Sequence, residues 1–171
     1  LILVLNIPVI YYLSIPFPKI PDLTDAVKSI EPGDTVQLKN LKAFYTNSTR
    51  DKVIGFYKKN TGHPFIEINH PPERAKEVIR DTIQSYYFEE LVFPLKGSLY
   101  INGFEWKNDV FTKPEKREKN KLLVNGVEYL SKVTTRTYYP HPIAQLINLL
   151  FLEIGLFIIF VAIKNSVRAR K

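Results

Sequence analysis

A carboxylate inside an apolar run is the most chemically telling feature of the chain. Residues 143–163 are almost wholly apolar, and Glu153 lies at their midpoint. A charged carboxylate at the centre of a membrane helix costs roughly 2.5–3.5 kcal/mol. Such a side chain needs a hydrogen-bonding partner, or it must be protonated.

Two further polar side chains share a helical face with Glu153. At about 100° per residue, Gln145, Asn148 and Glu153 fall within roughly 140° of arc, and Gly155 lies at its edge. Helix pairs in lipid make contact through small and polar residues on one face. We therefore predict that this face docks a partner membrane subunit or a second copy of the chain.

Two other roles for Glu153 stay open. As a structural group it would be protonated and bonded to Asn6 in the N-terminal apolar segment, to its own backbone, or to Glu153 of another copy. As an ionisable functional group it would serve as a proton or ion site. The expected interaction face thus comprises Gln145, Asn148, Glu153, Gly155 and Asn6.

A cluster of His and Glu side chains suggests a metal site, but its spacing argues against one. The residues are His63, Glu67, His70 and Glu73. In a strand, His63 and Glu67 share a face while His70 points the other way, and no HExxH or comparable spacing is present. We interpret the four as turn and capping residues around Pro64 and Pro71, and we expect no metal and no cofactor.

Residues for nucleophilic or carboxylate catalysis form no known motif in this sequence. The chain contains no Cys, which excludes thiolate catalysis, disulfides and Cys-based metal sites. A hydrolase using Glu89, Glu90 or Glu105 would need two carboxylates facing each other about 5–9.5 Å apart. We therefore predict that the protein is not an enzyme.

The C-terminal apolar run and its flank predict a membrane anchor. As a helix, residues 143–163 span about 31 Å, which matches a bilayer core. The tail, residues 164–171, carries Lys164, Arg168, Arg170 and Lys171. Because Lys and Arg are retained on the cytoplasmic side, we expect a cytoplasmic C-terminus and most of the chain outside the cytoplasm.

The N-terminal segment is a weaker membrane candidate. As a helix, residues 1–15 span only about 22 Å, short of the roughly 30 Å bilayer core. We favour a truncated transmembrane helix over residues 1–17, and the apolar part of a signal peptide is the alternative. The chain has no Met and begins with Leu1, so we expect its natural start to lie upstream.

The charge distribution limits the class of partner. The formal net charge is +7, and much of it lies in the basic tail. The remaining cationic excess is mild and spread over residues 22–139, which favours anionic surfaces such as lipid headgroups. It is too diffuse to indicate nucleic-acid binding.

Residues 22–139 predict an extracytoplasmic α+β domain. The apolar periodicities predict a strand over 35–45 with a bulge near Asn40, a short helix from Ser48 to Gly62, a strand over 64–69 and a helix over 71–88. A mobile charged loop over 113–121 and a final strand over 127–137 follow. We expect a small antiparallel or mixed sheet with two helices on one face.

Two segments of this domain share the pattern L-x-[IV]-N-G-[FV]-E-[WY]. They are residues 99–106 and 122–129. Asn-Gly between apolar runs is the strongest short hairpin signal, so we predict turns at Asn102-Gly103 and Asn125-Gly126. We interpret them as independent hairpins, with a duplicated ligand-binding unit as the alternative.

Together these features predict an α+β domain flanked by an N-terminal and a C-terminal transmembrane helix. The expected function is that of a cell-envelope protein that acts by binding or assembly, as a subunit or scaffold of a membrane complex. The alternatives are a ligand-sensing or glycan-binding ectodomain and, less favoured, an envelope hydrolase.

Overall fold

The computed structural model of the chain describes residues 2–32, 34, 40–78 and 85–169. Contacts divide the chain into two compact units. Residues 16–138 form the folded domain, and residues 1–15 with 139–171 form the helical unit. Parts of the expected first strand (35–39) and long helix (79–84), together with Arg170 and Lys171, lie outside the described residues.

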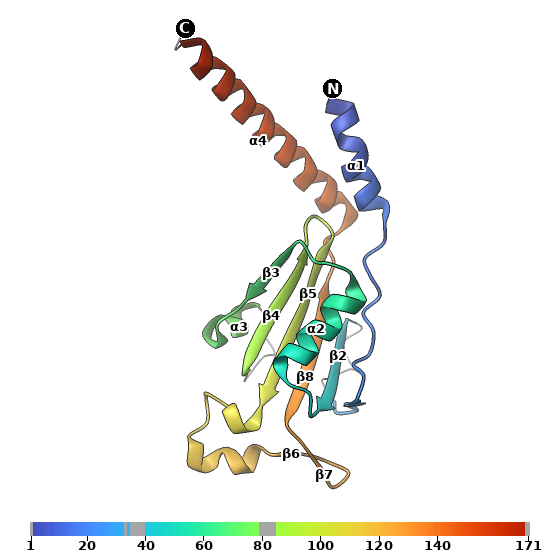
Figure 1. The fold of residues 1–171 in the computed structure, drawn as a ribbon, viewed down its shortest axis with the longest axis vertical. Helices are drawn as coiled ribbons and strands as arrows, with labels where there is room; N and C mark the ends of the chain where they lie inside the picture. Colours follow the sequence, from blue (N-terminus) through green and yellow to red (C-terminus); the bar gives the residue numbers. More distant parts are fainter. Residues whose placement is uncertain (1, 33, 35–39, 79–84, 170–171) are drawn as a thin grey trace. The chain divides into compact units, whose positions relative to one another are not determined.

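An antiparallel sheet of six strands forms the centre of the folded domain (Figure 1). In spatial order the strands are β1 (Ala26–Lys28), β2 (Leu41–Thr46), β8 (Ser131–Tyr138), β5 (Gly97–Glu105), β4 (Tyr87–Phe93) and β3 (Ile66–Asn69). Every neighbouring pair is antiparallel. The predicted α+β class is confirmed, and the sheet is antiparallel rather than mixed.

Helix α2 (Arg50–Thr61) packs on one face of the sheet. Val53 and Tyr57 are four residues apart, so they project from the same side of the helix. Both are fully buried, in one core cluster with Leu91 and Leu99. The short helix predicted from the sequence is thereby confirmed, although it begins without a side-chain capping bond.

Helix α3 (Pro72–Val78) packs on the opposite face. Its Ala75 forms a small cluster with Phe88 of β4, and Tyr100 of β5 packs against them. Successive residues of a strand point to opposite faces, so Phe88 faces away from the side on which Leu91 meets α2. The prediction of two helices on one face is therefore wrong, because β4 is apolar on both sides.

One of the two Asn-Gly pairs forms a turn. Asn125 and Gly126 connect β6 (Leu122–Val124) to β7 (Val127–Tyr129), with φ angles of 52° and 78°. Positive φ at both positions is what a type I′ turn requires. Asn102 and Gly103 instead lie inside β5, so the hairpin predicted there is wrong.

Gly103 is explained by packing rather than by a turn. It pairs directly with Tyr87 of β4, and a Cβ at Gly103 would overlap ring atoms of Tyr87. The glycine leaves room for the aromatic ring on the sheet. The two repeated segments thus have different structures and do not form a duplicated unit.

Between β5 and β8 the chain leaves the six-stranded sheet over residues 106–130, a segment that we call the excursion. It contains the 3₁₀ helices η1 (Trp106–Asn108) and η2 (Pro114–Asn120) and the β6–β7 pair. Arg117 of η2 donates to the backbone oxygens of Thr112 and Lys107. The charged segment expected to be a mobile loop is therefore a short helix held by its own side chains.

Two predicted boundaries also differ from the structure. The helix expected over 71–88 ends at Val78 in the described residues, and Tyr87 and Phe88 belong to β4. The strand expected over 127–137 is divided into β7 and β8, with Leu130 between them. Short apolar runs fit helix and strand periods alike, which explains the first error.

The helical unit contains α1 (Ile2–Ser14) and α4 (Pro142–Ala169). Within the described part of the chain, one helix is long and apolar enough to cross a membrane, over Pro142–Arg168. Helix α1 has 13 residues with Pro8 inside it, a length of about 20 Å. A transmembrane helix at the N-terminus is therefore not supported.

Candidate functional site

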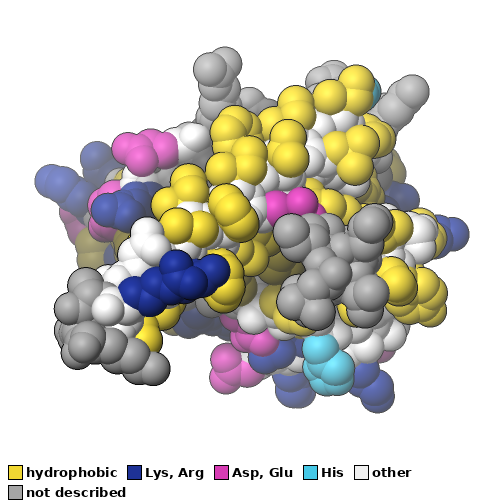
Figure 2. Space-filling model, turned by 90° about the horizontal axis from the view of Figure 1, so that it is seen from above, with side chains coloured by type: hydrophobic (Ala, Val, Ile, Leu, Met, Phe, Trp, Pro, Cys, Tyr) yellow, Lys and Arg dark blue, Asp and Glu magenta, His cyan; other side chains and the backbone are white. Residues whose placement is uncertain are grey.

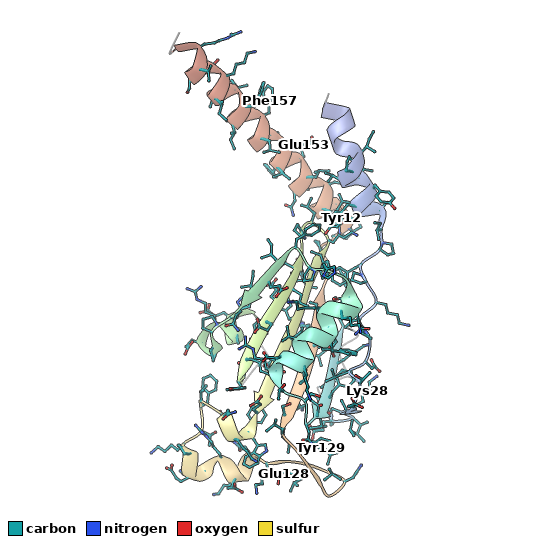
Figure 3. The ribbon with its side chains drawn as sticks, viewed as in Figure 1. Tyr12, Lys28, Glu128, Tyr129, Glu153 and Phe157 are labelled. Carbon is teal, nitrogen blue, oxygen red and sulfur yellow. The ribbon has the colours of Figure 1, made fainter. Side chains whose placement is uncertain are left out.

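Of the five residues predicted to form a membrane contact, Asn6 lies in α1 and the other four lie in α4. Gln145 and Asn148 fall in its first half, and Glu153 lies about halfway along it (Figure 3). Their side chains form no hydrogen bond or ion pair with other residues that the structure describes. The side chain of Asn6 is not described, so its contact with Glu153 stays a prediction.

Large apolar side chains surround these polar groups along α4. Phe151 and Leu156 are 69% and 59% exposed, and none of the most apolar stretch of the helix is buried. In the space-filling view, hydrophobic side chains fill much of the visible face (Figure 2). The helix therefore presents an apolar surface interrupted by a few polar groups.

The ends of α4 differ in chemistry. Pro142 begins the helix directly after Tyr139-Pro140-His141, and Tyr139 is 47% exposed. Lys164 and Arg168 are exposed in the last turns. Aromatic residues at one end and basic residues at the other are typical of the two interfaces of a membrane helix.

A second candidate site lies within the folded domain. A groove of about 700 Å³ runs between α2 and strands β3 and β4; we call it the α2–β3 groove. It is lined by Arg50, Asp51, Ile54, Gly55, Lys58, Lys59, His63, Glu67 and Glu89. The α2 residues among these lie beside the buried stripe of Val53 and Tyr57, so the groove follows the flank of the helix.

Charges in the α2–β3 groove are largely neutralised by one another. Arg50 donates to Glu89, which also accepts a 2.8 Å hydrogen bond from Nδ2 of Asn69. Lys58 Nζ lies 2.8 Å from Glu67. Three acidic and three basic side chains line the groove, so it offers no net attraction for an anion or a cation.

Glu90 belongs to the other face of the sheet. Its Oε2 lies 3.0 Å from Nε2 of His70. Burial, followed by the nearby Glu90 carboxylate, raises the pKa of Tyr100 to about 12. His70, Glu90 and Tyr100 thus form a polar group between β3, β4 and β5, separate from the α2–β3 groove.

The carboxylates considered for hydrolysis are not brought together as a facing pair. Glu89 and Glu90 are successive residues of β4 and point to opposite faces. Glu105 lies at the end of β5, where it accepts a 2.7 Å hydrogen bond from Asn108. Glu89 pairs with Ile101, four residues before Glu105, so the backbones of Glu89 and Glu105 are offset by about 13 Å along the strands. These three residues therefore form no facing carboxylate pair.

The His and Glu residues considered as metal ligands are also separated. His63 and Glu67 line the α2–β3 groove, His70 pairs with Glu90, and Glu73 is exposed in the first turn of α3. No group of three or more potential metal ligands occurs within the described ranges.

No protein-family model, curated protein or solved structure matches the chain. The function must therefore be inferred from α4 and the folded domain alone. Sequence reasoning missed the α2–β3 groove, although a charged flank and Gly55 beside a buried stripe were visible in residues 50–59. What was missing was the position of β3 at the edge of the sheet.

Proposed function

We propose that this protein is a membrane-anchored component of the cell envelope that acts by assembly rather than by catalysis. Its contact face within the membrane consists of Gln145, Asn148, Glu153 and Gly155, and it docks another membrane subunit or a second copy. The folded domain lies outside the cytoplasm and the basic tail inside it. Asn6 is a further candidate for this contact.

The position of Glu153 carries the proposal. Helix α4 has 28 residues, about 42 Å, which is enough to cross a bilayer with both ends in the interfaces. Glu153 is near its centre, without a hydrogen bond or ion pair to the described residues. Since a carboxylate at that depth is costly unless it is bonded, a second helix is the natural source of the bond.

The geometry of the helix supplies a face for that contact. The polar arc from Asn148 through Gln145 to Glu153 carries these three polar groups among leucines. Gly155 next to it allows close approach of another backbone. Asn165 lies on the opposite side of α4, at about 100° per residue. Specific docking should depend on residues of the polar arc and not on residues of the opposite side. Non-specific association of an apolar helix would not show this difference.

Glu153→Leu and Glu153→Gln in the full-length chain test the proposal. In a mild detergent, affinity capture of wild type should yield a bound membrane protein or a dimer. Glu153→Leu should reduce it at least tenfold, about 1.4 kcal/mol. Glu153→Gln, which can still form hydrogen bonds, should retain most of it.

Asn165→Leu is the matched control, because it removes a polar group from the same helix on the other side. It should leave the complex intact. Unfolding of the folded domain should be the same in all variants, since Glu153 is not part of it. Equal capture by Glu153→Leu and wild type would count against assembly through α4.

A second candidate function is ligand binding by the folded domain. It is favoured by Gly55, which lies inside α2 and lines the α2–β3 groove with no atom within 4 Å of an added Cβ. Glycine costs about 1 kcal/mol relative to Ala inside a helix, and packing in the domain does not require it. A ligand that approaches the helix closely would account for it.

A further inference from the structure

The pairing of the strands shows which end of the sheet lies closest to α4 along the chain. Strand β8 ends at Tyr138, which pairs with Ser98 of β5. Ser98 pairs with Val92 of β4, and Val92 pairs with Ile66 of β3. The beginning of β3 is therefore level with the end of β8, although three strand spacings, about 14 Å, separate them across the sheet. We call this end of the sheet the exit end.

The loop between α2 and β3, residues 62–65, belongs to the exit end (Figure 1). Phe65 N donates to Val92 O near the end of β4. The first residues of the folded domain reach the same end, since the ring centre of Phe17 lies 5.1 Å from that of Phe93. Both connections to the helical unit therefore leave the folded domain at the end of the sheet that carries this loop.

Exposed aromatic and cationic side chains stand at the exit end. Phe65 and Tyr138 are 69% and 59% exposed. Lys59 in the last turn of α2 and Lys19 near the first connection are also exposed. Neither lysine forms an ion pair with the residues that the structure describes. Aromatic rings and lysines are the side chains that favour the headgroup region of a bilayer.

The length of the connection keeps the exit end close to a bilayer that α4 spans. From Tyr138 to Ile143, where the apolar run begins, there are five residue steps, at most about 18 Å when fully extended. The headgroup region itself extends about 5–7 Å beyond each side of the hydrocarbon core. The connection is therefore too short to hold the exit end far above the headgroups.

Exposed apolar side chains also occur beyond the opposite end of the sheet, where Leu123 of the excursion is 63% exposed. Strand β5 has nine residues, so about 26 Å of sheet separate that end from the exit end. Exposure alone therefore does not select a lipid contact. The short connection to α4 does, and it selects the exit end.

We propose that the loop of residues 62–65 docks on the lipid surface of the membrane that α4 crosses. The ring of Phe65 inserts among the headgroups, and Lys59 of the preceding helical turn binds anionic headgroups. The loop and the connection after Tyr138 are two supports about 14 Å apart, which fix the orientation of the folded domain on the membrane. The inference rests on the proposed function, since it requires that α4 span the bilayer.

Quenching of a fluorescent label by lipids tests the contact, because the chain has no Cys of its own. Full-length His63→Cys carries the label in vesicles of neutral and anionic phospholipids. This variant keeps Phe65, and His63 is exposed, so the label should not disturb the core. Lipids with a nitroxide near the headgroup should quench it at least twofold. Leu123→Cys, an exposed position at the opposite end, is the matched control and should not be quenched.

A third labelled position separates failure of this contact from failure of the membrane anchor. Ile154 lies near the middle of α4, on the side opposite the polar arc. A label on Ile154→Cys should be quenched by lipids with a nitroxide deep in the acyl chain. Quenching at position 154 without quenching at position 63 would overturn the lipid contact alone. Absence of quenching at position 154 would overturn the anchor, and the contact with it.

Phe65→Ser in the His63→Cys background tests the inserted ring. It should reduce the quenching by at least half, because serine gains little from leaving water. Unfolding of the folded domain should be unchanged, since the Phe65 side chain is mostly exposed. Equal quenching with and without Phe65 would overturn the insertion of this side chain.

Lys59→Glu in the same background tests the headgroup charge. It should reduce quenching at position 63 in anionic vesicles and leave it unchanged in neutral ones. Lys116→Glu reverses an exposed charge in η2, at the opposite end, and should change nothing in either. The same loss of quenching in neutral and anionic vesicles would overturn the contact of Lys59 with anionic headgroups.

Discussion

At the scale of single residues, two glycines in the folded domain have opposite consequences. Gly103 lies on β5 directly beside the ring of Tyr87, where a Cβ would overlap the ring. Gly55 lies in α2, where a Cβ meets nothing. A substitution that adds the same methyl group should therefore destabilise the domain at one position and stabilise it at the other.

Gly103→Ala should lower the free energy of unfolding by about 1–3 kcal/mol, since it forces the Tyr87 ring from its position. Denaturant unfolding of the full chain in detergent measures this. Combining it with Tyr87→Leu should recover part of the loss, because the clash is then smaller. An unchanged midpoint in Gly103→Ala would contradict the packing explanation.

Gly55→Ala should raise the free energy of unfolding by about 0.5–1 kcal/mol, because alanine loses less backbone entropy in a helix. The same unfolding experiment measures it. If the α2–β3 groove binds a ligand close to the helix, this stabilised variant should bind it more weakly. A destabilised Gly55→Ala would mean that the space beside α2 is occupied.

The ion pair of Asp22 with Lys42 should make stability depend on acid pH. A 2.6 Å hydrogen bond from Lys42 is the largest influence on the Asp22 carboxyl and lowers its pKa. A carboxyl with a lowered folded-state pKa stabilises the fold above its unfolded value, about 3.9. That contribution is lost as the pH falls through the folded-state pKa.

Asp22→Asn should therefore be less stable than wild type at pH 7. The difference should shrink below about pH 3.9 and vanish once the carboxyl is protonated in both states. The Asp22 side chain is 53% exposed, so the effect should be under about 1 kcal/mol. Glu115→Gln, at an exposed position without an ion pair to described residues, serves as the control in the same unfolding titrations. A difference that persists in strong acid would contradict the assignment.

At the scale of elements, η2 shows how a charged segment becomes ordered. Asp109 is almost fully buried; it accepts hydrogen bonds from Phe111 N and from Asn120 Nδ2. These hydrogen bonds join the residues that precede η2 to Asn120 at its end. Lys116 and Lys119 of η2 remain exposed, but their backbone is held in place.

In Asp109→Ala, trypsin should cleave η2 at least tenfold faster than in wild type, since Phe111 N and Asn120 Nδ2 lose their hydrogen-bond acceptor. Digestion of the full chain followed by mass spectrometry identifies cleavage after Lys116, Arg117 and Lys119. Glu115→Ala changes the same segment without touching these contacts and should digest like wild type. Equal rates for all three proteins would contradict the role of Asp109 in holding η2.

Local patterns predicted some elements correctly and failed where tertiary contacts decide. The stripe of Val53 and Tyr57 located α2, and Asn125-Gly126 located a true turn. Asn102-Gly103 carries the same local signal but pairs with β4, because Tyr87 needs the space at Gly103. No local pattern distinguishes the two cases.

The candidate contact face on α4 could be proposed from the sequence alone. Glu153 stands out in any apolar run, and its place in α4 follows from helical periodicity. The position of β3 at the edge of the sheet could not be predicted, because it depends on the strand order. The sequence leaves that strand order ambiguous, because β4 is apolar on both faces. The sequence also does not show that residues 106–130 leave the sheet.

At the scale of the whole molecule, the chain enters and leaves the folded domain at one end of the sheet. A Cβ at Gly97, after the β4–β5 turn, would overlap Tyr138 O and lie 3.2 Å from the Phe17 ring. Phe17 and Tyr138 stand next to the two connections to the helical unit. A domain attached at a single end suits an anchored protein.

In the proposed topology, α4 crosses a membrane with the folded domain outside and the tail inside. Single cysteines in this cysteine-free chain test it most directly, at exposed Lys116 in η2 and at exposed Ser166 in α4. In intact bacterial cells that express the full chain, a membrane-impermeant maleimide should label Lys116→Cys. It should label Ser166→Cys only after permeabilisation. Labelling of Ser166→Cys in intact cells, or recovery of the protein without membranes, would contradict the account.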